Sequence, residues 1–225
     1  MSKTGMVKGI QVSRLYPTDD DATVTGARFK WKPFKPAASD YSKLPPFHSM
    51  STDEVRGFDK ETIGKARSGF VTICLSTNYA LVDLVRNRDD YPDVLLGQIR
   101  FVGSLGDFHI RRIRSDSAGE IQQGKAAEIM ATFGISPEPV AATTHQPGGK
   151  HESAIQRIVH RARAMALLAP WMPPSMWGLA LKYAAVVNNY TAGLLHGKVS
   201  TPIERVTGVR ADANRVPIRV WGCSR

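Results

Sequence analysis

Two apolar segments rich in β-branched residues constrain the fold of this chain more than any other part of its sequence. The segments GFVTICLST and YALVDLV follow one another with only the polar break at Thr77 and Asn78 between them. Two such segments joined by a short polar turn are typical of a β-hairpin. We therefore expect residues 69–85 to form an antiparallel pair of strands.

The segments on either side of this hairpin predict a domain in which strands and helices alternate. A strand-like segment precedes the hairpin, and apolar residues at helical spacing follow it as far as Gly103. The sequence then predicts a strand of alternating apolar and basic residues, a short helix closed by Gly134 and another strand. In chain order the expected elements are 47–55, 69–77, 79–85, 91–103, 108–115, 121–134 and 137–143.

Two further helices are expected in the last third of the chain. The first follows the loop THQPGG, and its apolar residues recur at steps of three and four, so that one stripe faces a core. That stripe consists of Ile155, Ile158, Val159, Ala162, Met165 and Ala169. The second helix follows the break at Pro173 and Pro174 and runs from Ser175, its expected N-cap, to about Leu195.

The charge balance indicates a polyanionic partner. Thirty lysine and arginine residues against twenty aspartate and glutamate residues give a formal net charge of +10 and a pI near 9.8. Nucleic acid is the first such partner to consider, although a basic surface can also serve solubility alone. The basic side chains gather on the helix that follows THQPGG. The expected nucleic-acid contacts are Lys150, Arg157, His160 and Arg161.

Several other classes of protein are excluded by the composition. No apolar stretch approaches the roughly 18 residues of a membrane-spanning helix, and the polar start of the chain lacks the apolar core of a signal peptide. Cys74 and Cys223 are far apart and have no metal-ligand spacing around them, so neither a disulfide framework nor a zinc site is expected. We expect an intracellular chain without a membrane partner.

Three acidic residues stand where the predicted elements would bring them together. Asp116 ends the strand at 108–115, Glu152 begins the basic helix, and Asp53 lies in the first strand. Taken singly, each has an ordinary structural explanation, since an acidic residue such as Glu152 also stabilises the start of a helix. Together they suit two magnesium ions about 4 Å apart, an arrangement that serves in-line displacement at a phosphodiester.

Five ordered motifs then point to a known family. Thirty-five residues separate Asp116 from Glu152, within IRRIRSDSAGEI and HQPGGKHESAIQRIVHRARAM. Downstream follow Trp177 with Ala180 and Ala184, then TPIE at 201–204, then RVWGC at 219–223. In these motifs the segment from about Ser49 to Cys223 resembles the integrase catalytic core of retrotransposon polyproteins of the Ty1/copia group and, behind them, the retroviral integrases.

This resemblance implies a fold, a reaction and a set of partners. The implied fold is α/β and ribonuclease H-like, a mixed five-stranded sheet flanked by helices. The implied activity is metal-dependent processing of DNA 3′ ends and strand transfer of retroelement cDNA into target DNA, with two Mg²⁺ or Mn²⁺ ions. A homo-oligomer acting on DNA in the nucleus is implied as well.

The resemblance assigns the metal-binding, catalytic carboxylates to Asp53, Asp116 and Glu152. Asp116 and Glu152 match the second and third acidic residues of the family motif directly. The first acid departs from the family pattern: Gly57 is not followed by proline, Glu54 lies three residues before Gly57, and Asp53 lies four residues before it. We take Asp53 as the first choice and Glu54 as the second. Asp59, in a segment that resembles a turn, is the third.

The expected organisation has three parts. Residues 1–46 read as an irregular basic arm, residues 47–198 as the catalytic core, and residues 199–225 as a truncated C-terminal extension. The family's zinc module is not found in the sequence, which suggests a fragment or a decayed copy of a mobile element. Two alternatives follow: a non-catalytic remnant that binds nucleic acid, and a ribonuclease H-type nuclease.

Overall fold

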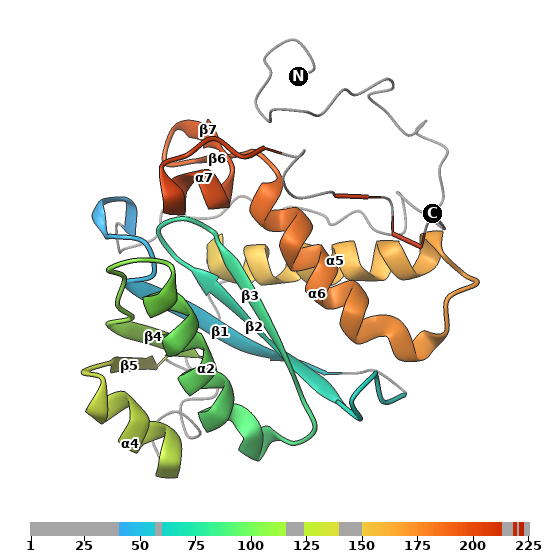
Figure 1. Cartoon of the computed structure of the whole chain (residues 1–225), viewed down its shortest axis with the longest axis horizontal. Helices are drawn as coiled ribbons and strands as arrows, with labels where there is room; N and C mark the ends of the chain where they lie inside the picture. Colours follow the sequence, from blue (N-terminus) through green and yellow to red (C-terminus); the bar gives the residue numbers. More distant parts are fainter. Residues whose placement is uncertain are drawn as a thin grey trace.

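The computed structural model describes residues 41–56, 60–115, 124–139, 150–212, 218–219 and 221–222. A five-stranded sheet in the order β3-β2-β1-β4-β5 lies at its centre (Figure 1). The strands are β1 (Ser49–Val55), β2 (Ser68–Cys74), β3 (Ala80–Val85), β4 (Arg112–Ser115) and β5 (Ser136–Pro139). β2 is antiparallel to both β1 and β3, whereas β4 is parallel to both β1 and β5. The predicted mixed five-stranded sheet flanked by helices is confirmed.

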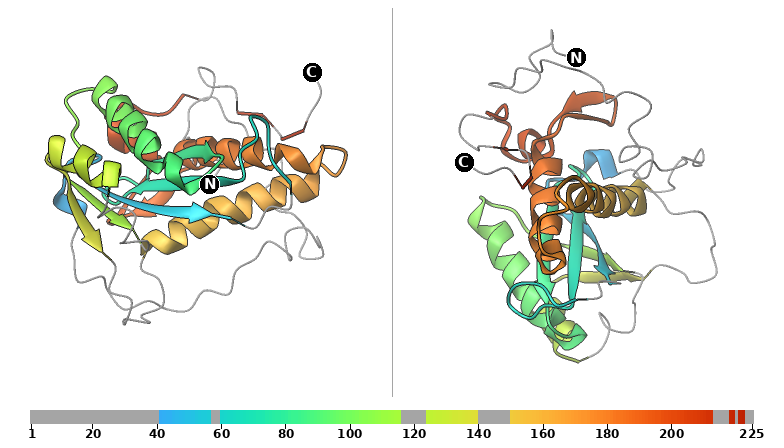
Figure 2. Two further views of the ribbon diagram at one scale, coloured as in Figure 1. Left: turned by 90° about the horizontal axis from the view of Figure 1, so that it is seen from below. Right: turned by 90° about the vertical axis from the view of Figure 1, so that its right-hand side faces the viewer.

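Helices cover both faces of this sheet. They are α2 (Tyr91–Ser104), α4 (Gly124–Thr132), α5 (Lys150–Leu168), α6 (Trp177–Tyr190) and α7 (Pro202–Thr207), with short 3-10 turns η2 (Tyr41–Lys43), η3 (Arg88–Asp90) and η4 (Pro174–Met176). A small hairpin, β6 (Gly193–Leu195) and β7 (Lys198–Ser200), follows α6. Figure 2 shows α2 and α5 on opposite sides of the sheet. In the part of the chain that is described, no helix is long and apolar enough to cross a membrane.

The predicted central hairpin is formed by β2 and β3. Ile73 pairs with Ala80 across it, and the turn between them is closed where the Asn78 N–H donates to the Cys74 carbonyl at 2.8 Å. Asn78 has a φ of 61°, a left-handed conformation that asparagine tolerates better than most residues. Every residue of β2 is buried, as expected for a mostly apolar strand that is covered on both faces.

Side chains alternate along the strands between two separate cores. Met50 and Phe70 join Leu95 of α2 and Met130 of α4 in the first core. Val55, Val71 and Ile73 join residues of α5 and α6 in the second core, which includes Ile158 and Leu181. Because successive residues of a strand point to opposite faces, even-numbered positions of β1 face α2 and odd-numbered positions face α5.

The predicted apolar stripe of α5 is confirmed, whereas the predicted start and end of the next helix are wrong. Ser175 lies within η4, and α6 begins at Trp177 without any side-chain cap. The chain leaves the helix at Thr191, where the backbone is extended, and residues 193–195 enter strand β6 instead. The N-cap position of α6 is Met176, one residue after Ser175, because the packing of Trp177 and Gly178 against residues 60–62 sets where the helix begins.

The segment after the β6–β7 hairpin packs on the sheet domain. Thr201 and Glu204 form a capping box at the start of α7, and Val206 joins the first core. The Arg205 guanidinium donates to the carbonyl oxygens of Thr77 at 3.1 Å and Ser200 at 2.7 Å. Arg205 thereby ties the small hairpin to the turn between β2 and β3.

The outer edge of β3 is closed by a side chain of α6. The Ala80 N–H donates to Oδ1 of Asn189 at 2.7 Å, and Nδ2 of Asn189 donates back to the Ala80 carbonyl at 2.9 Å. Asn189 is buried, so the amide takes the place that another strand would occupy at an open sheet edge.

The start of α6 is closely packed against the segment that leads into β2. The indole Nε1 of Trp177 donates to the Lys60 carbonyl at 2.7 Å, and the ring is 8% exposed. The next residue has no room for a side chain, since a Cβ at Gly178 would lie 2.7 Å from Leu84 and Thr62 atoms. Trp177 and Gly178 thus fix the start of α6 against β3 and the segment before β2.

We expect Asn189→Leu to lower the free energy of unfolding by about 2 to 4 kcal/mol, because the buried N–H and C=O of Ala80 would both lose their partners. Chemical denaturation measures this change. Lys182→Ala, an exposed position on the same helix, serves as the control and should change stability by less than about 0.5 kcal/mol. Equal stability of the two variants would contradict the edge-closing role.

We expect Trp177→Ala to cost about 3 to 5 kcal/mol, because a large buried ring leaves a cavity. The matched control is Trp171→Ala, since Trp171 is 68% exposed and has a hydrogen bond of its own to the Gly222 carbonyl. Thermal or chemical unfolding of both variants separates a core tryptophan from a surface one. A similar loss in the two variants would argue against burial as the cause.

Candidate active site

The candidate site lies at the C-terminal ends of β1 and β4, two inner strands of the sheet. These strands run parallel, and Thr52 of β1 pairs with Ser115, the last residue of β4. Asp53 follows Thr52 and is half-buried. Its odd position places it on the face of the sheet that α5 covers, the face on which Val55 joins the second core.

Helix α5 brings the segment that contains Glu152 to this face. Residue 152 stands in the first turns of α5, and Ala154 and Ile155 belong to the same core as Val55. The side chain of Glu152 and the whole of Asp116 and Asp59 lie outside the described residues. The joint arrangement of the three carboxylates therefore stays a prediction. Among the side chains that are described, no group of three His, Cys, Asp or Glu residues could hold a metal.

The alternative first carboxylate, Glu54, occupies the other face of β1. Its side chain is only 7% exposed and forms an ion pair with Arg56, and this interaction raises the pKa of the arginine. Asp53 and Glu54 thus point away from each other, and Asp53 is the one that shares a face with α5.

A buried hydrogen-bond network supports β1 beside Asp53. The Thr72 hydroxyl donates to the Thr52 hydroxyl at 3.0 Å. Nε2 of Gln98, on α2, donates to the Thr72 hydroxyl at 3.1 Å and to Oδ2 of Asp83 at 2.8 Å. The network joins three strands and a helix. Sequence reasoning missed it, because its members are far apart in the chain and have no local pattern.

The predicted nucleic-acid contacts on α5 differ in exposure. Arg157 is exposed, while His160 and Arg161 are half-buried, and the side chain of Lys150 is not described. Burial lowers the pKa of the Arg161 guanidinium, and the charge of Arg157 lowers it further. Its Nη1 is buried without a hydrogen-bond partner among the described residues. Arg157 is therefore the most accessible of the three described positions.

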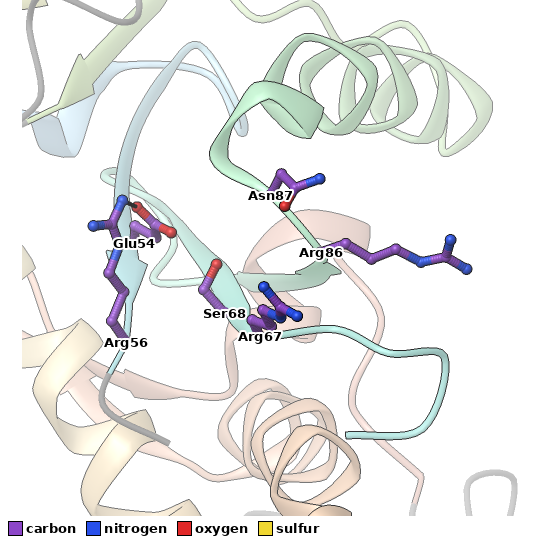
Figure 3. Close-up of a pocket in the computed structure, with 6 residues that line it drawn as sticks. All are labelled: Glu54, Arg56, Arg67, Ser68, Arg86 and Asn87. Carbon is purple, nitrogen blue, oxygen red and sulfur yellow. Dashed lines mark ion pairs between the residues drawn. The ribbon is translucent and has the colours of Figure 1, made fainter. Parts of the chain in front are cut away.

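A second group of charged residues at the same end of the sheet was not predicted. An open pocket there is lined by Glu54, Arg56, Arg67, Ser68, Arg86 and Asn87 (Figure 3). The three arginines stand at the ends of β1, β2 and β3. In the sequence they are 11 and 19 positions apart, and the pairing of the strands brings them together.

The fold is that of an integrase catalytic core, which is ribonuclease H-like. The chain superimposes on the integrase catalytic core domain of HTLV-2 in complex with magnesium, with a TM-score of 0.53 and 15% identity for the trimeric form, covering 72% of this chain and 97% of that chain. For the dimeric form the TM-score is 0.54, with 16% identity over 72% of this chain and 98% of that one.

A second viral structure and one curated protein extend this comparison. The simian T-cell lymphotropic virus intasome in complex with PP2A regulatory subunit B56 gamma gives a TM-score of 0.60 and 15% identity, over 74% of this chain and 56% of that chain. In sequence, the chain is 30% identical over 112 residues to the retrovirus-related Pol polyprotein from transposon TNT 1-94 of Nicotiana tabacum. This match covers 50% of the chain and 7% of the polyprotein.

These comparisons confirm the predicted resemblance to the integrase core of retrotransposon polyproteins. The chain spans only a small part of the curated relative that it matches. No family model matches the sequence.

We expect Gln98→Leu to lower the free energy of unfolding by about 1 to 3 kcal/mol, since the buried Thr72 hydroxyl and the Asp83 carboxylate would each lose a donor. Arg100→Ala, an exposed change on the same helix, is the control and should stay within about 0.5 kcal/mol of the wild type. Chemical denaturation of the three proteins provides the measurement. An unchanged denaturation midpoint for Gln98→Leu would contradict the role of this hydrogen-bond network in supporting β1.

Proposed function

We propose that this chain is the catalytic core of a retrotransposon integrase, which processes DNA 3′ ends and joins cDNA to target DNA with Mg²⁺ or Mn²⁺. Its integrase-core fold and its similarity to a retrotransposon Pol polyprotein support this proposal. The magnesium named for the HTLV-2 core supports the choice of cofactor. The dimeric and trimeric forms and the intasome named for the neighbours support a homo-oligomer acting on DNA, and the reaction calls for access to nuclear DNA.

The observation that carries the proposal is the pairing of Thr52 with Ser115. Asp53 and Asp116 directly follow these paired residues in the sequence, and because consecutive Cα atoms are about 3.8 Å apart, this pairing supports assigning both acids to the same end of the sheet. Glu152 belongs to the first turns of the helix that packs on β1 and β2. These two observations support the proposal that the three carboxylates, distant in the sequence, form one site.

The donor set fits a hard divalent cation. Asp53 is a half-buried carboxylate at a strand end, on the face that α5 covers, and Mg²⁺ prefers such oxygen ligands. We assign Asp53, Asp116 and Glu152 as its ligands. Two such ions, when bound, supply activation of the attacking oxygen and stabilisation of the leaving oxygen.

The chain's own basic residues position the substrate in this proposal. Arg157 is exposed on α5, and guanidinium groups bind backbone phosphates without reading the base sequence. Lys150, His160 and Arg161 are assigned to the same role on the same helix. The phosphate backbone would then run along α5, next to the edge that carries Asp53.

We expect Asp53→Asn, Asp116→Asn and Glu152→Gln each to reduce strand transfer at least about 100-fold, because each removes a charged ligand of the cation. The assay joins a short labelled DNA end to target DNA in the presence of Mn²⁺. Mn²⁺ at 100 times its Kd should also stabilise the wild type by about 2.7 kcal/mol in thermal unfolding, and Asp53→Asn should remove this effect.

Glu54→Gln is the matched control for this experiment, since Glu54 adjoins Asp53 in sequence but lies on the opposite face. It should reduce transfer far less than Asp53→Asn does, whereas Asp107→Asn, a change at an exposed carboxylate outside both proposed sites, should keep transfer within a few-fold of the wild type. A loss in Glu54→Gln with full activity in Asp53→Asn would move the first carboxylate to Glu54. Cleavage of RNA in a hybrid without strand transfer would indicate a ribonuclease H-type nuclease, and DNA binding without any metal response would indicate a non-catalytic remnant.

A further inference from the structure

The pocket at the ends of β1, β2 and β3 is lined by three arginines; in Figure 3 the Arg56 guanidinium lies beside Glu54, whereas the Arg86 side chain extends away from them. Ser68 pairs with Val85, which belongs to the first core, so the pocket opens on the α2 side of the sheet. Neighbouring strands are about 4.8 Å apart, and the three arginine-bearing strand ends therefore span about 10 Å along the edge. The positive charge at the pocket is therefore spread along a row of arginines and is not concentrated at one point.

The charges of this row are only partly matched by carboxylates. Arg56 pairs with Glu54, and Arg67 pairs with Glu61, with Nη2 at 2.7 Å from Oε1. The Arg86 guanidinium forms no ion pair with a described residue, and its Nε donates to the Gly64 carbonyl at 3.0 Å, while the backbone N–H of Arg86 donates to Oδ2 of Asp90 at 3.0 Å. The six lining residues thus include three cations and one anion.

The existing ion pair of Arg67 leaves it available to a ligand. The Arg67 side chain is 69% exposed and that of Glu61 is 43% exposed, and ion pairs so open to water are weak. A phosphate can therefore replace the Glu61 carboxylate at little cost. Guanidinium groups bind phosphate oxygens through two parallel N–H donors, and the Ser68 hydroxyl and the Asn87 amide add neutral donors at the same pocket.

The location of the row favours an extended polyanion over a small anion. Glu54 of the pocket adjoins Asp53 in β1, so the row and the candidate active site share one edge of the sheet and lie on its two faces. A nucleic-acid strand that runs along α5 to Asp53 would contact the three arginines where it continues past this end of the sheet to the other face.

We propose that Arg67 and Arg86, with Arg56, form a binding site for backbone phosphates of the nucleic-acid strand that passes the candidate active site. This inference rests on the proposed function, because it takes the nucleic acid from it. It adds a second contact surface, on the α2 side of the sheet, to the contacts assigned to α5.

The test measures binding rather than catalysis. Fluorescence anisotropy with a labelled 20-base-pair duplex gives Kd for the full chain between 50 and 300 mM NaCl. Arg67→Ala/Arg86→Ala should make the slope of log K against log[salt] less steep by about 1.8, since each phosphate contact contributes about 0.9. Arg67→Lys/Arg86→Lys keeps both charges and should restore most of the slope.

The control variant is Arg100→Ala/Arg111→Ala, which removes two exposed arginines outside the pocket. It should leave the slope within about 0.5 of the wild type, because neither arginine belongs to the pocket or to α5. Equal slopes for the alanine pair in the pocket and the control would overturn the proposal. A loss of slope that the lysine pair does not restore, accompanied by a lower melting temperature, would attribute the effect to misfolding and would also overturn it.

Inorganic pyrophosphate distinguishes the two sources of phosphate. If it raises the melting temperature of the wild type but not of Arg67→Ala/Arg86→Ala, while the DNA slope is the same in both, the pocket binds free phosphate anions and the nucleic-acid assignment is wrong. If the chain catalyses strand transfer but the pocket variant leaves the salt slope unchanged, only the pocket proposal is contradicted. If the pocket variant changes the slope but the chain shows no strand transfer, the proposed function is contradicted and the pocket proposal is retained.

Discussion

The pairing of β1 with its two neighbours is the constraint on which the rest of the structure depends. β1 joins the antiparallel hairpin on one side to the parallel strand β4 on the other, so it sets the registers of both halves of the sheet. Because its side chains alternate, the same seven residues supply the first core, the second core and the candidate site. A shift of the β1 register by one residue would place Glu54 instead of Asp53 on the α5 side, and it would move Val55 from the second core to the first.

Sequence reasoning succeeded where the signal was local. The hairpin follows from two β-branched segments around Asn78, and α5 follows from apolar residues at three- and four-residue steps, which need no knowledge of distant contacts. It failed at Ser175, where serine after a proline pair resembles an N-cap but enters a 3-10 turn instead. There the close packing of Trp177 and Gly178 against residues 60–62 sets where the helix begins, and no local pattern reports that contact.

The candidate site was predictable in its residue types but not in its faces. Acidic residues near strand and helix ends could be found in the sequence, and a two-residue period already implies that Asp53 and Glu54 point apart. Which of them faces α5 depends on how the sheet is covered, and that became visible only with the two cores. The Gln98 network and the arginine row are assembled from several strands, so each member looks like an ordinary polar residue in the sequence.

The charged residues of β1 and its C-terminal end are divided between the two faces of the strand. Glu54 and Arg56 are two residues apart and share the α2 side, where they pair with each other. On the α5 side the same-strand neighbours of Asp53 are Ser51 and Val55, neither of them charged. An arginine in either position would compete with a divalent cation for the Asp53 carboxylate, because a guanidinium binds carboxylate through two hydrogen bonds. Alternation along one strand thus lets the proposed cation-binding face and the proposed phosphate-binding face adjoin without neutralising each other.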